Sequence, residues 1–286
     1  MVWVASAVLF FLVAAALLAA WRFLDRTFDQ RTWARLIEQA GAPVAVFDHA
    51  LIASLPEPAQ RYFRYTIAPG ALLHRVVELD MEGELGLGTA EQPDYRAMSA
   101  LQVIAAPYGF VWQMRAGAIS GSDGATPARS WTRFWLFGLL PIVRAGSNED
   151  HRRSAFGRCV AEGAFWAPAS LLPGEATRWE PLDVDSARAI VSFAGLEQAV
   201  DITVAEDGRP TRVVIQRWSN ENPEKVFCEQ PFGGDMAEFR EFGGYRLPTV
   251  VEGGNHFGTE EYFPFFKARV SDIRFPCAGG TASSAG

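Results

Sequence analysis

Acidic side chains alternate along one short stretch of the sequence and could do chemistry together. They occupy every second position of residues 78–84, as Glu78, Asp80, Glu82 and Glu84. On an extended strand such positions lie about 7 Å apart on one face, where carboxylates could bind calcium or act as acid and base. Any half-buried strand also alternates charged with apolar residues. We therefore interpret the four carboxylates as the solvated face of a strand.

Histidine and cysteine are the other residue types that could hold a metal ion. His74, His151 and His256 are far apart and form neither an H-x-x-x-H nor an H-E-x-x-H motif. The cysteines are equally scattered and form no C-x-x-C, so they indicate neither a zinc site nor a disulfide framework; they are Cys159, Cys228 and Cys277. We expect no metal and no cofactor.

One polar loop combines side chains that could act as acid, base and hydrogen-bond donor. Residues 253–263, "GGNHFGTEEYF", contain His256, Glu260, Glu261 and Tyr262 after two glycines. These residues are a candidate polar site, and an ordinary loop beside a hairpin is the alternative interpretation.

Motifs and charge exclude several familiar functions. The sequence has no G-x-S-x-G, no P-loop and no G-x-G-x-x-G after a strand. A net charge of -7 and a pI near 5.2 argue against a surface that neutralises nucleic-acid phosphates. The sequence favours a role other than catalysis, with an enzyme of unknown class as an alternative.

Aromatic residues are the most unusual candidates. Two tryptophans stand among three prolines in residues 163–183, a stretch that is too rich in proline for a helix or a central strand. One interpretation is that these rings fill the core beneath a sheet that has few helices to cover it. The other is that five rings line an apolar cavity for a lipid or another hydrophobic ligand, namely Trp112, Trp131, Trp135, Trp166 and Trp179.

The N-terminal segment predicts a membrane anchor. Residues 1–21 carry no charge, and a helix of that length spans about 30 Å, the hydrocarbon thickness of a bilayer. A cleaved signal peptide is the alternative, although it would have a basic start and a shorter apolar run. We predict a single-pass anchor over residues 1–22. Four following arginines favour a cytoplasmic domain, whereas a long folded domain behind one helix can be translocated regardless of charge.

The rest of the chain must supply the elements that position these residues. We expect a juxtamembrane helix and connector over residues 23–53, with the helix ending at Gly41 and the connector passing through Pro43. A single β-rich domain should then occupy residues 54–276, beginning with a helix capped by Ser54, and residues 277–286 should be a disordered tail.

Hydrophobic periodicity predicts the fold class of this domain. Alternation indicates strands near 73–88, 95–105, 109–115 and 130–137, with the small residues of 116–128 as a loop. A helix capped by Ser147 should follow over 148–165, and a meander of strands with hairpin turns should complete the chain. We predict a mainly β (α+β) protein whose large antiparallel meander sheet curls into a half-barrel covered by one or two helices.

Several motifs together resemble a bacterial family known only as a domain of unknown function. They are "LPEPAQRYFR" (55–64), "GFVWQMR" (109–115), "FWAPASLLPG" (165–174), "RWEPLD" (178–183) and "FREFGGYRLPTVVEGG" (239–254). The resemblance implies a fold similar to the half-barrels of Lol-type lipoprotein carriers, and it implies no catalytic residues.

These observations support one leading hypothesis and two alternatives. The leading hypothesis is a membrane-anchored half-barrel that contacts the bilayer through its N-terminal helix and binds a lipid or another hydrophobic small molecule. The alternatives are a structural or assembly protein that binds a protein partner, and the enzyme of unknown class.

Overall fold

The computed structural model describes residues 2–41 and 45–276. Pro43 and the predicted tail, residues 277–286, lie outside the described residues. The helical elements are α1 (Val2–Glu38), η1 (His49–Ile52), α2 (Glu57–Thr66), α3 (Glu149–Trp166) and η2 (Pro168–Leu171).

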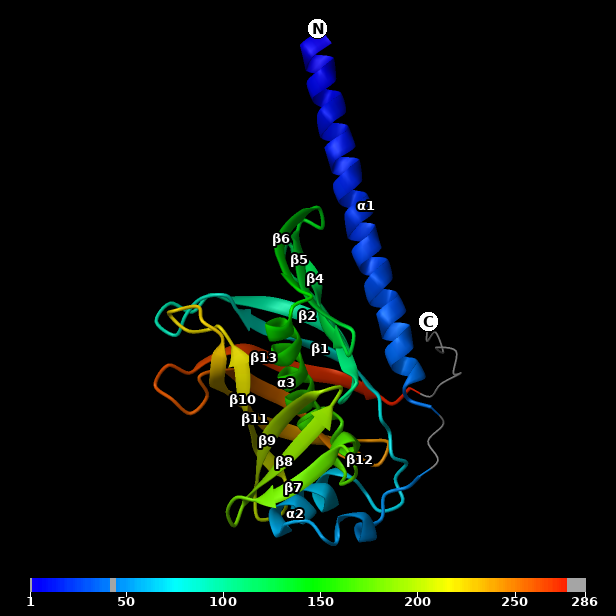
Figure 1. Ribbon diagram of the computed structural model, residues 1–286, viewed down its shortest axis with the longest axis vertical. Coiled ribbons are helices and arrows are strands. Elements are labelled where there is room, and N and C mark those ends of the chain that lie inside the picture. Colours follow the sequence, from blue (N-terminus) through cyan, green and yellow to red (C-terminus); the bar gives the residue numbers. More distant parts are fainter. Residues whose placement is uncertain (1, 42–44, 277–286) are drawn as a thin grey trace.

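The strands form one antiparallel sheet (Figure 1). Its first half consists of β1 (Val77–Gly86), β2 (Tyr95–Ala105), β3 (Gly109–Ala116), β4 (Ile119–Thr126), β5 (Arg129–Leu136) and β6 (Leu140–Gly146). Its second half consists of β7 (Thr177–Pro181), β8 (Ser186–Phe193), β9 (Leu196–Val204), β10 (Pro210–Ser219), β11 (Cys228–Phe242), β12 (Tyr245–Asn255) and β13 (Phe263–Arg274).

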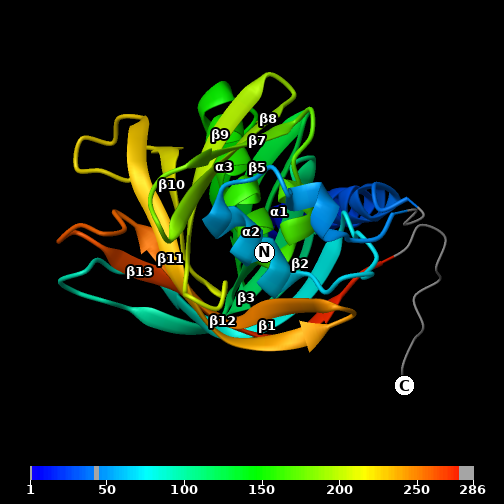
Figure 2. The same ribbon diagram turned by 90° about the horizontal axis from the view of Figure 1, so that it is seen from below.

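The order of the strands confirms the predicted meander. It runs β6-β5-β4-β3-β2-β1-β13-β12-β11-β10-β9-β8-β7, so neighbours in sequence are neighbours in space except where β1 pairs with β13. Seen from below, the sheet curls around α3, and α2 lies across the same concave side (Figure 2). The sheet does not close, because β6 and β7 remain its two edges. The fold is the predicted half-barrel.

The concave face carries the main hydrophobic core. The alternation of β1 places Val77, Leu79 and Met81 in this core, as the period of two predicts. The apolar stripe of α3, which includes Phe156 and Cys159, is buried against the same face. Sequence periodicity therefore predicted both layers of the domain.

The small-residue segment predicted as a loop is instead strand β4. Gly121 and Gly124 lie directly beside the rings of Phe134 and Trp131 on the neighbouring strand β5, and a Cβ at either glycine would meet those rings within about 2.6 Å. Glycine therefore serves here to make room for aromatic neighbours and does not indicate a turn.

Two predicted helix caps are wrong by one or two residues. The cap of α3 is Asn148, whose side chain accepts a hydrogen bond from the backbone N–H of His151, whereas Ser147 precedes it with a φ of 62°. The cap of α2 is Pro56, and no side chain caps this helix. The helical conformation is disfavoured for Leu55, which precedes a proline, and Pro56 itself is extended with a ψ of 147°, so the helix starts at Glu57 and not after Ser54.

The predicted anchor and juxtamembrane helix form one continuous helix, α1, which ends three residues before Gly41. It is the one helix in residues 2–41 and 45–276 that is long and apolar enough to cross a membrane. Its second half packs against the convex face of the sheet, where Leu36 is buried with Val103, Val111 and Trp131. The two faces of the sheet therefore have separate cores.

Candidate ligand cavity and its charged wall

A cavity of about 250 Å³ lies between α3 and the concave face of the sheet. Most of its wall is apolar. The apolar lining residues are Leu85, Trp112, Phe134, Ala161, Phe165, Val213, Phe232, Met236, Val251, Phe265 and Phe266. A partly open apolar cavity with a few polar groups at its wall is the usual form of a small-molecule site.

Glycines keep this space free of side chains. Gly234 on β11 and Gly253 on β12 are direct partners in the sheet, and both line the cavity. Across from them α3 presents Ala161, which adds only a methyl group. Because no large side chain projects from these three positions, a void remains between the helix and the sheet instead of a filled core.

A buried ionic cluster forms the polar part of the wall. The guanidinium of Arg158 forms ion pairs with Asp123 at 2.5 Å and with Glu162 at 2.6 Å, and Gln102 donates a second hydrogen bond to Glu162. All three charged side chains are at most 16% exposed. The guanidinium also lies over the ring of Trp112, 5.1 Å from its centroid. The cluster is therefore charge-paired and in contact with the apolar lining.

Arg217 is the second cation at the cavity wall. Its Nε donates to the hydroxyl of Ser154 at 3.2 Å, and its guanidinium lies 4.8 Å from the ring centroid of Phe232. Burial, together with the nearby Arg158, lowers the pKa of Arg217 to about 10, so it stays charged at neutral pH. Among the described residues it forms no ion pair with a carboxylate within 4 Å. Its guanidinium is therefore a polar group available to a ligand.

Acidification through pH 6.5 is expected to destabilise the protein through His151. Burial lowers the pKa of this imidazole from 6.5, while Asp123 raises it and Arg217 lowers it by smaller amounts. The unfolded chain therefore takes up the proton first. The stability that neutral His151 contributes is complete above pH 6.5, and it is lost as the pH falls from there towards the folded-state pKa. Melting temperatures between pH 8 and pH 5 should fall less for His151→Gln than for the natural chain, and equal declines would contradict this role.

The five candidate tryptophans occupy different places. Trp112 lines the cavity. Trp131 and Trp135 face α1 on the convex side, where their rings lie 5.0 Å from Phe28 and 5.6 Å from Trp21. These two rings belong to the contact between the helix and the sheet.

The other two tryptophans belong to the main core. Trp166 is the last residue of α3 and is fully buried, and its Nε1 donates to the carbonyl oxygen of Pro248 at 3.3 Å. Trp179 lies on the edge strand β7 and is partly buried, with its ring 5.6 Å from that of Phe63. Of the three prolines in this stretch, Pro168 begins the short helix η2, and Pro181 lies in β7, where an edge strand tolerates it because one side of the strand needs no hydrogen-bond partner.

The structure brings part of the predicted polar loop together. His256 lies with Nδ1 3.8 Å from the carboxylate of Glu261 and with Nε2 2.7 Å from the carbonyl oxygen of Glu221. Glu260 points into solvent. Burial raises the pKa of Tyr262, whose ring packs edge-on against a neighbouring aromatic residue. The loop therefore pairs one histidine with one carboxylate.

The alternating carboxylates of β1 are on the convex face. Asp80 forms an ion pair with Arg274 of the neighbouring strand, and Glu78 accepts a hydrogen bond from Trp33 of α1 at 2.6 Å. Their environment is the outer face of the sheet, as the strand interpretation predicts.

Sequence reasoning missed the charged residues of the cavity wall. Asp123 lies in the segment 116–128 that the sequence predicted as a loop, and Arg217 lies in a segment with the pattern of an ordinary amphipathic strand. A signal did exist for Arg158 and Glu162. They are one helical turn apart, beside the apolar stripe of α3, where charged residues would be buried.

The fold and the cavity define the class of this protein: an open antiparallel half-barrel with a helix inside it and an apolar pocket between the two. The chain belongs to the family of unknown function DUF6544, which it matches over residues 45–268. This membership confirms the resemblance found in the sequence. Comparison with curated proteins gave no match.

Two solved structures are similar to the chain. One is a LolA superfamily protein from Nitrosomonas europaea, with 9% identity and a TM-score of 0.42, covering 76% of this chain and 91% of that one. The other is a domain described as an outer membrane lipoprotein-sorting protein, from Vibrio parahaemolyticus, with 15% identity and a TM-score of 0.38, covering 72% of this chain and 87% of that one. The strand order and the curl of the sheet define the half-barrel independently of these likenesses.

Proposed function

We propose that this protein is a membrane-anchored half-barrel that binds a lipid or another hydrophobic small molecule in the cavity beneath α3. The observation that carries the proposal is the apolar cavity itself, kept open by the paired glycines Gly234 and Gly253. A structural domain would gain stability by filling such a void, because an unfilled cavity costs packing energy.

The size of the cavity suits a chain-like ligand. An apolar cavity of about 150 Å³ already binds benzene, and drug-sized ligands occupy about 300–1,000 Å³. A cavity of about 250 Å³ therefore accommodates one segment of an acyl chain or a small apolar molecule, and not a whole phospholipid. A polar head, where one is present, would lie near the guanidinium of Arg217.

The N-terminal helix would keep this cavity beside a source of such ligands. Most of the large apolar side chains in the first half of α1 are exposed, and none of its most apolar stretch is buried in the protein, as expected for a segment whose solvent is lipid. A single-pass anchor would hold the half-barrel at the bilayer surface.

Filling the cavity is expected to abolish ligand retention. Gly253→Leu would project a side chain into the void from the sheet, where a Cβ meets its nearest atom at 3.1 Å, and Ala161→Phe would do so from α3. Native mass spectrometry of the natural full-length chain, purified from membranes, should detect a bound apolar molecule. Both variants should lose it while keeping a cooperative thermal transition.

A control variant should keep the ligand. Val184→Phe adds a ring at an exposed position of the β7–β8 connection, away from the cavity. Retention of the same molecule by both filled variants, or a natural chain that carries no apolar molecule, would reject the proposed function. The two introduced side chains enter the cavity from opposite walls, so if one variant misfolds, the other still tests the proposal.

A further inference from the structure

The β5–β6 hairpin ends in an apolar tip that points the same way as the exposed half of α1. Residues 134–143, "FWLFGLLPIV", contain no charged or hydrogen-bonding side chain except the indole of Trp135. Phe137 at the turn is 77% exposed, and Leu140, Ile142 and Val143 are exposed as well. This tip projects from the body beside α1 (Figure 1). It is an unusually large apolar group for a solvent-exposed turn.

Contacts along β5 fix its direction relative to α1. Trp131 lies against Phe28, whereas Trp135, four residues later, lies against Trp21, seven residues earlier in the helix. Strand β5 therefore runs towards the N-terminus of α1, and the turn at Phe137 lies beyond the level of Trp21.

The depth of the tip follows from strand geometry. Phe137 is two residues beyond Trp135, which corresponds to about 7 Å along a strand. It therefore lies beside the apolar segment of α1, past the interfacial ring of Trp21. Side chains that bind at a membrane interface are buried by about 5–10 Å.

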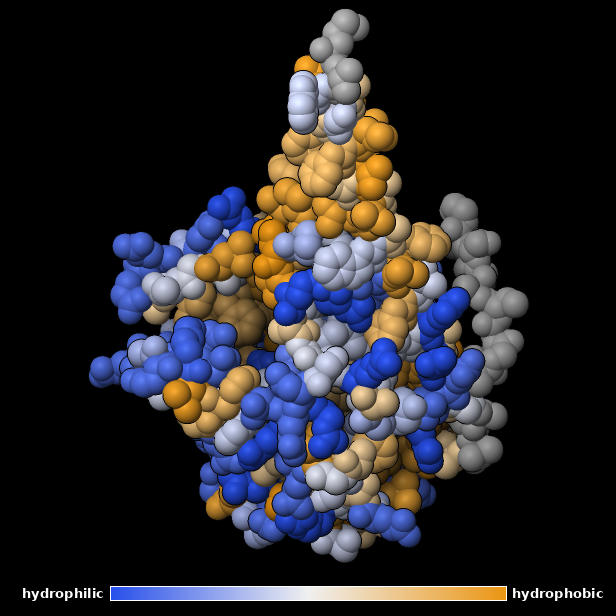
Figure 3. All heavy atoms as spheres, turned by 45° about the horizontal axis from the view of Figure 1, so that its top comes forward, coloured by the Kyte–Doolittle hydropathy of each residue, from blue (hydrophilic) through white to orange (hydrophobic). Residues whose placement is uncertain are grey.

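Charged residues mark the base of the tip. Arg133 and Arg144 are partners across the hairpin, and both pair with Asp25 of α1, which also accepts a hydrogen bond from the indole of Trp135 at 3.1 Å. The guanidinium of Arg144 lies over the ring of Trp21 at 4.4 Å. On both α1 and the hairpin, the surface therefore changes from charged to apolar at the same distance from the body of the protein. Figure 3 shows the apolar surface of α1 continuing onto the body of the protein.

We infer that the tip of the β5–β6 hairpin is a second membrane contact, which inserts into the interface of the same leaflet that α1 enters. The inference rests on the proposed anchoring by α1. We infer the lipid bilayer as the partner of this apolar tip, because the exposed tip lies past the ring of Trp21, at the level of the apolar segment of α1. With α1 and the hairpin both inserted, the half-barrel would hold a fixed orientation to the membrane.

Site-specific fluorescence in phosphatidylcholine vesicles tests the inference on the full-length chain. A background with Cys228→Ser and Cys277→Ser leaves only the buried Cys159. An environment-sensitive label is then placed by Phe137→Cys, with Leu12→Cys in the apolar half of α1 and Val184→Cys as references. Val184 lies beside α2, whose Arg61 donates to its carbonyl oxygen at 2.6 Å, at the end of the body remote from the N-terminus (Figure 1).

The label at position 137 should show blue-shifted emission, loss of quenching by aqueous iodide, and quenching by lipid with a shallow spin label. The label at 12 should be quenched by deep spin-labelled lipid, and the label at 184 should be quenched by iodide alone. A lipid-buried label at 12 with a water-exposed label at 137 would overturn this inference and leave the anchoring intact. A water-exposed label at 12 would overturn both. A label at 137 shielded from iodide but unquenched by lipid would also overturn the inference, because a second protein copy would then cover the tip.

Discussion

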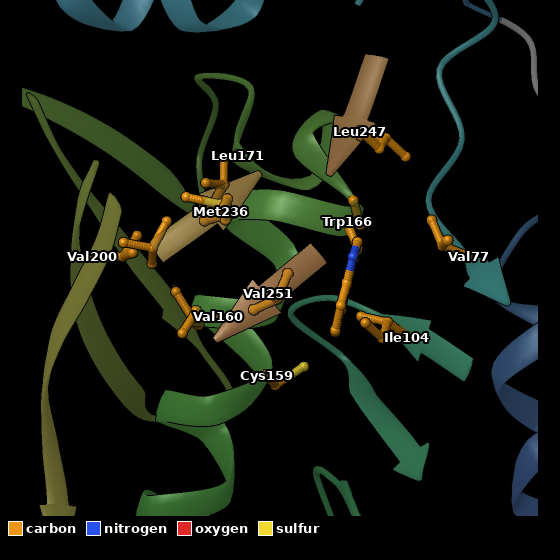
Figure 4. Packing of buried hydrophobic residues seen from close by; sticks show 14 of the residues in the cluster. Val77, Ile104, Cys159, Val160, Trp166, Leu171, Val200, Met236, Leu247 and Val251 are labelled. Atoms are coloured by element: carbon orange, nitrogen blue, oxygen red, sulfur yellow. The ribbon is translucent and has the colours of Figure 1, made fainter. Parts of the chain in front are cut away.

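Replacement of Trp166 by alanine is expected to lower the free energy of unfolding by about 3–5 kcal/mol. The ring is fully buried where α3 ends, among Ile104, Leu247 and Val77 (Figure 4). Its indole N–H also donates to the carbonyl oxygen of Pro248, which the truncation would leave unpaired. Urea titration of the full-length chain in detergent, followed by far-ultraviolet circular dichroism, measures this loss.

Trp179 provides the comparison for this result. Its ring is only partly buried on the edge strand β7, so Trp179→Ala should cost less than Trp166→Ala. Trp166→Phe should keep most of the packing and recover most of the stability. A loss below that of Trp179→Ala would mean that the ring of Trp166 adjoins an existing void, contrary to the packed core.

Replacement of Arg158 by methionine is also expected to lower the free energy of unfolding by about 3–5 kcal/mol. The substitution keeps most of the side-chain length but leaves Asp123 and Glu162 as two carboxylates in a nearly dry site without their common cation. The attraction of a buried pair offsets the cost of desolvating it, so removal of one partner exposes that cost in full. The same urea titration at neutral pH measures the effect.

An exposed arginine provides the matched control. Arg178 pairs with Glu197 across the edge of the sheet, and both side chains are more than half exposed. Arg178→Met should therefore cost less than about 1 kcal/mol. The double variant Arg158→Met, Glu162→Gln should recover part of the loss, because it removes one uncompensated charge. If Arg158→Met cost no more than Arg178→Met, the cluster would be hydrated and the charged wall of the cavity would need another explanation.

The position of this cluster relates stability to the proposed function. Arg158 contacts both the carboxylates and the ring of Trp112, which lines the cavity. Fixing the helix to β4 through Asp123 would hold the cavity wall in place while the space beside it stays empty. A ligand site of this kind needs a rigid frame because the void itself supplies no packing.

The amino-acid sequence alone determined the class and order of most elements. Period-two alternation in β1 and the hairpin turns of the second half required antiparallel strands, and the single apolar segment at the N-terminus required a helix long enough to cross a bilayer. These features depend on local spacing of apolar residues, which the sequence displays directly. The family motifs pointed to the same half-barrel.

Only the tertiary structure decided which residues share a site. Gly121 and Gly124 indicate a loop by composition, yet the rings of β5 beside them make the segment a strand. Asp123 between them then meets Arg158 of α3, 35 residues later in the chain. The five candidate tryptophans also lie in different environments. Alternation assigns each strand tryptophan to a face of the sheet, but the curl of the sheet and the packing of α1 decide what that face contacts. The site depends on contacts between distant segments, and such contacts follow from how the whole sheet curls and not from local spacing.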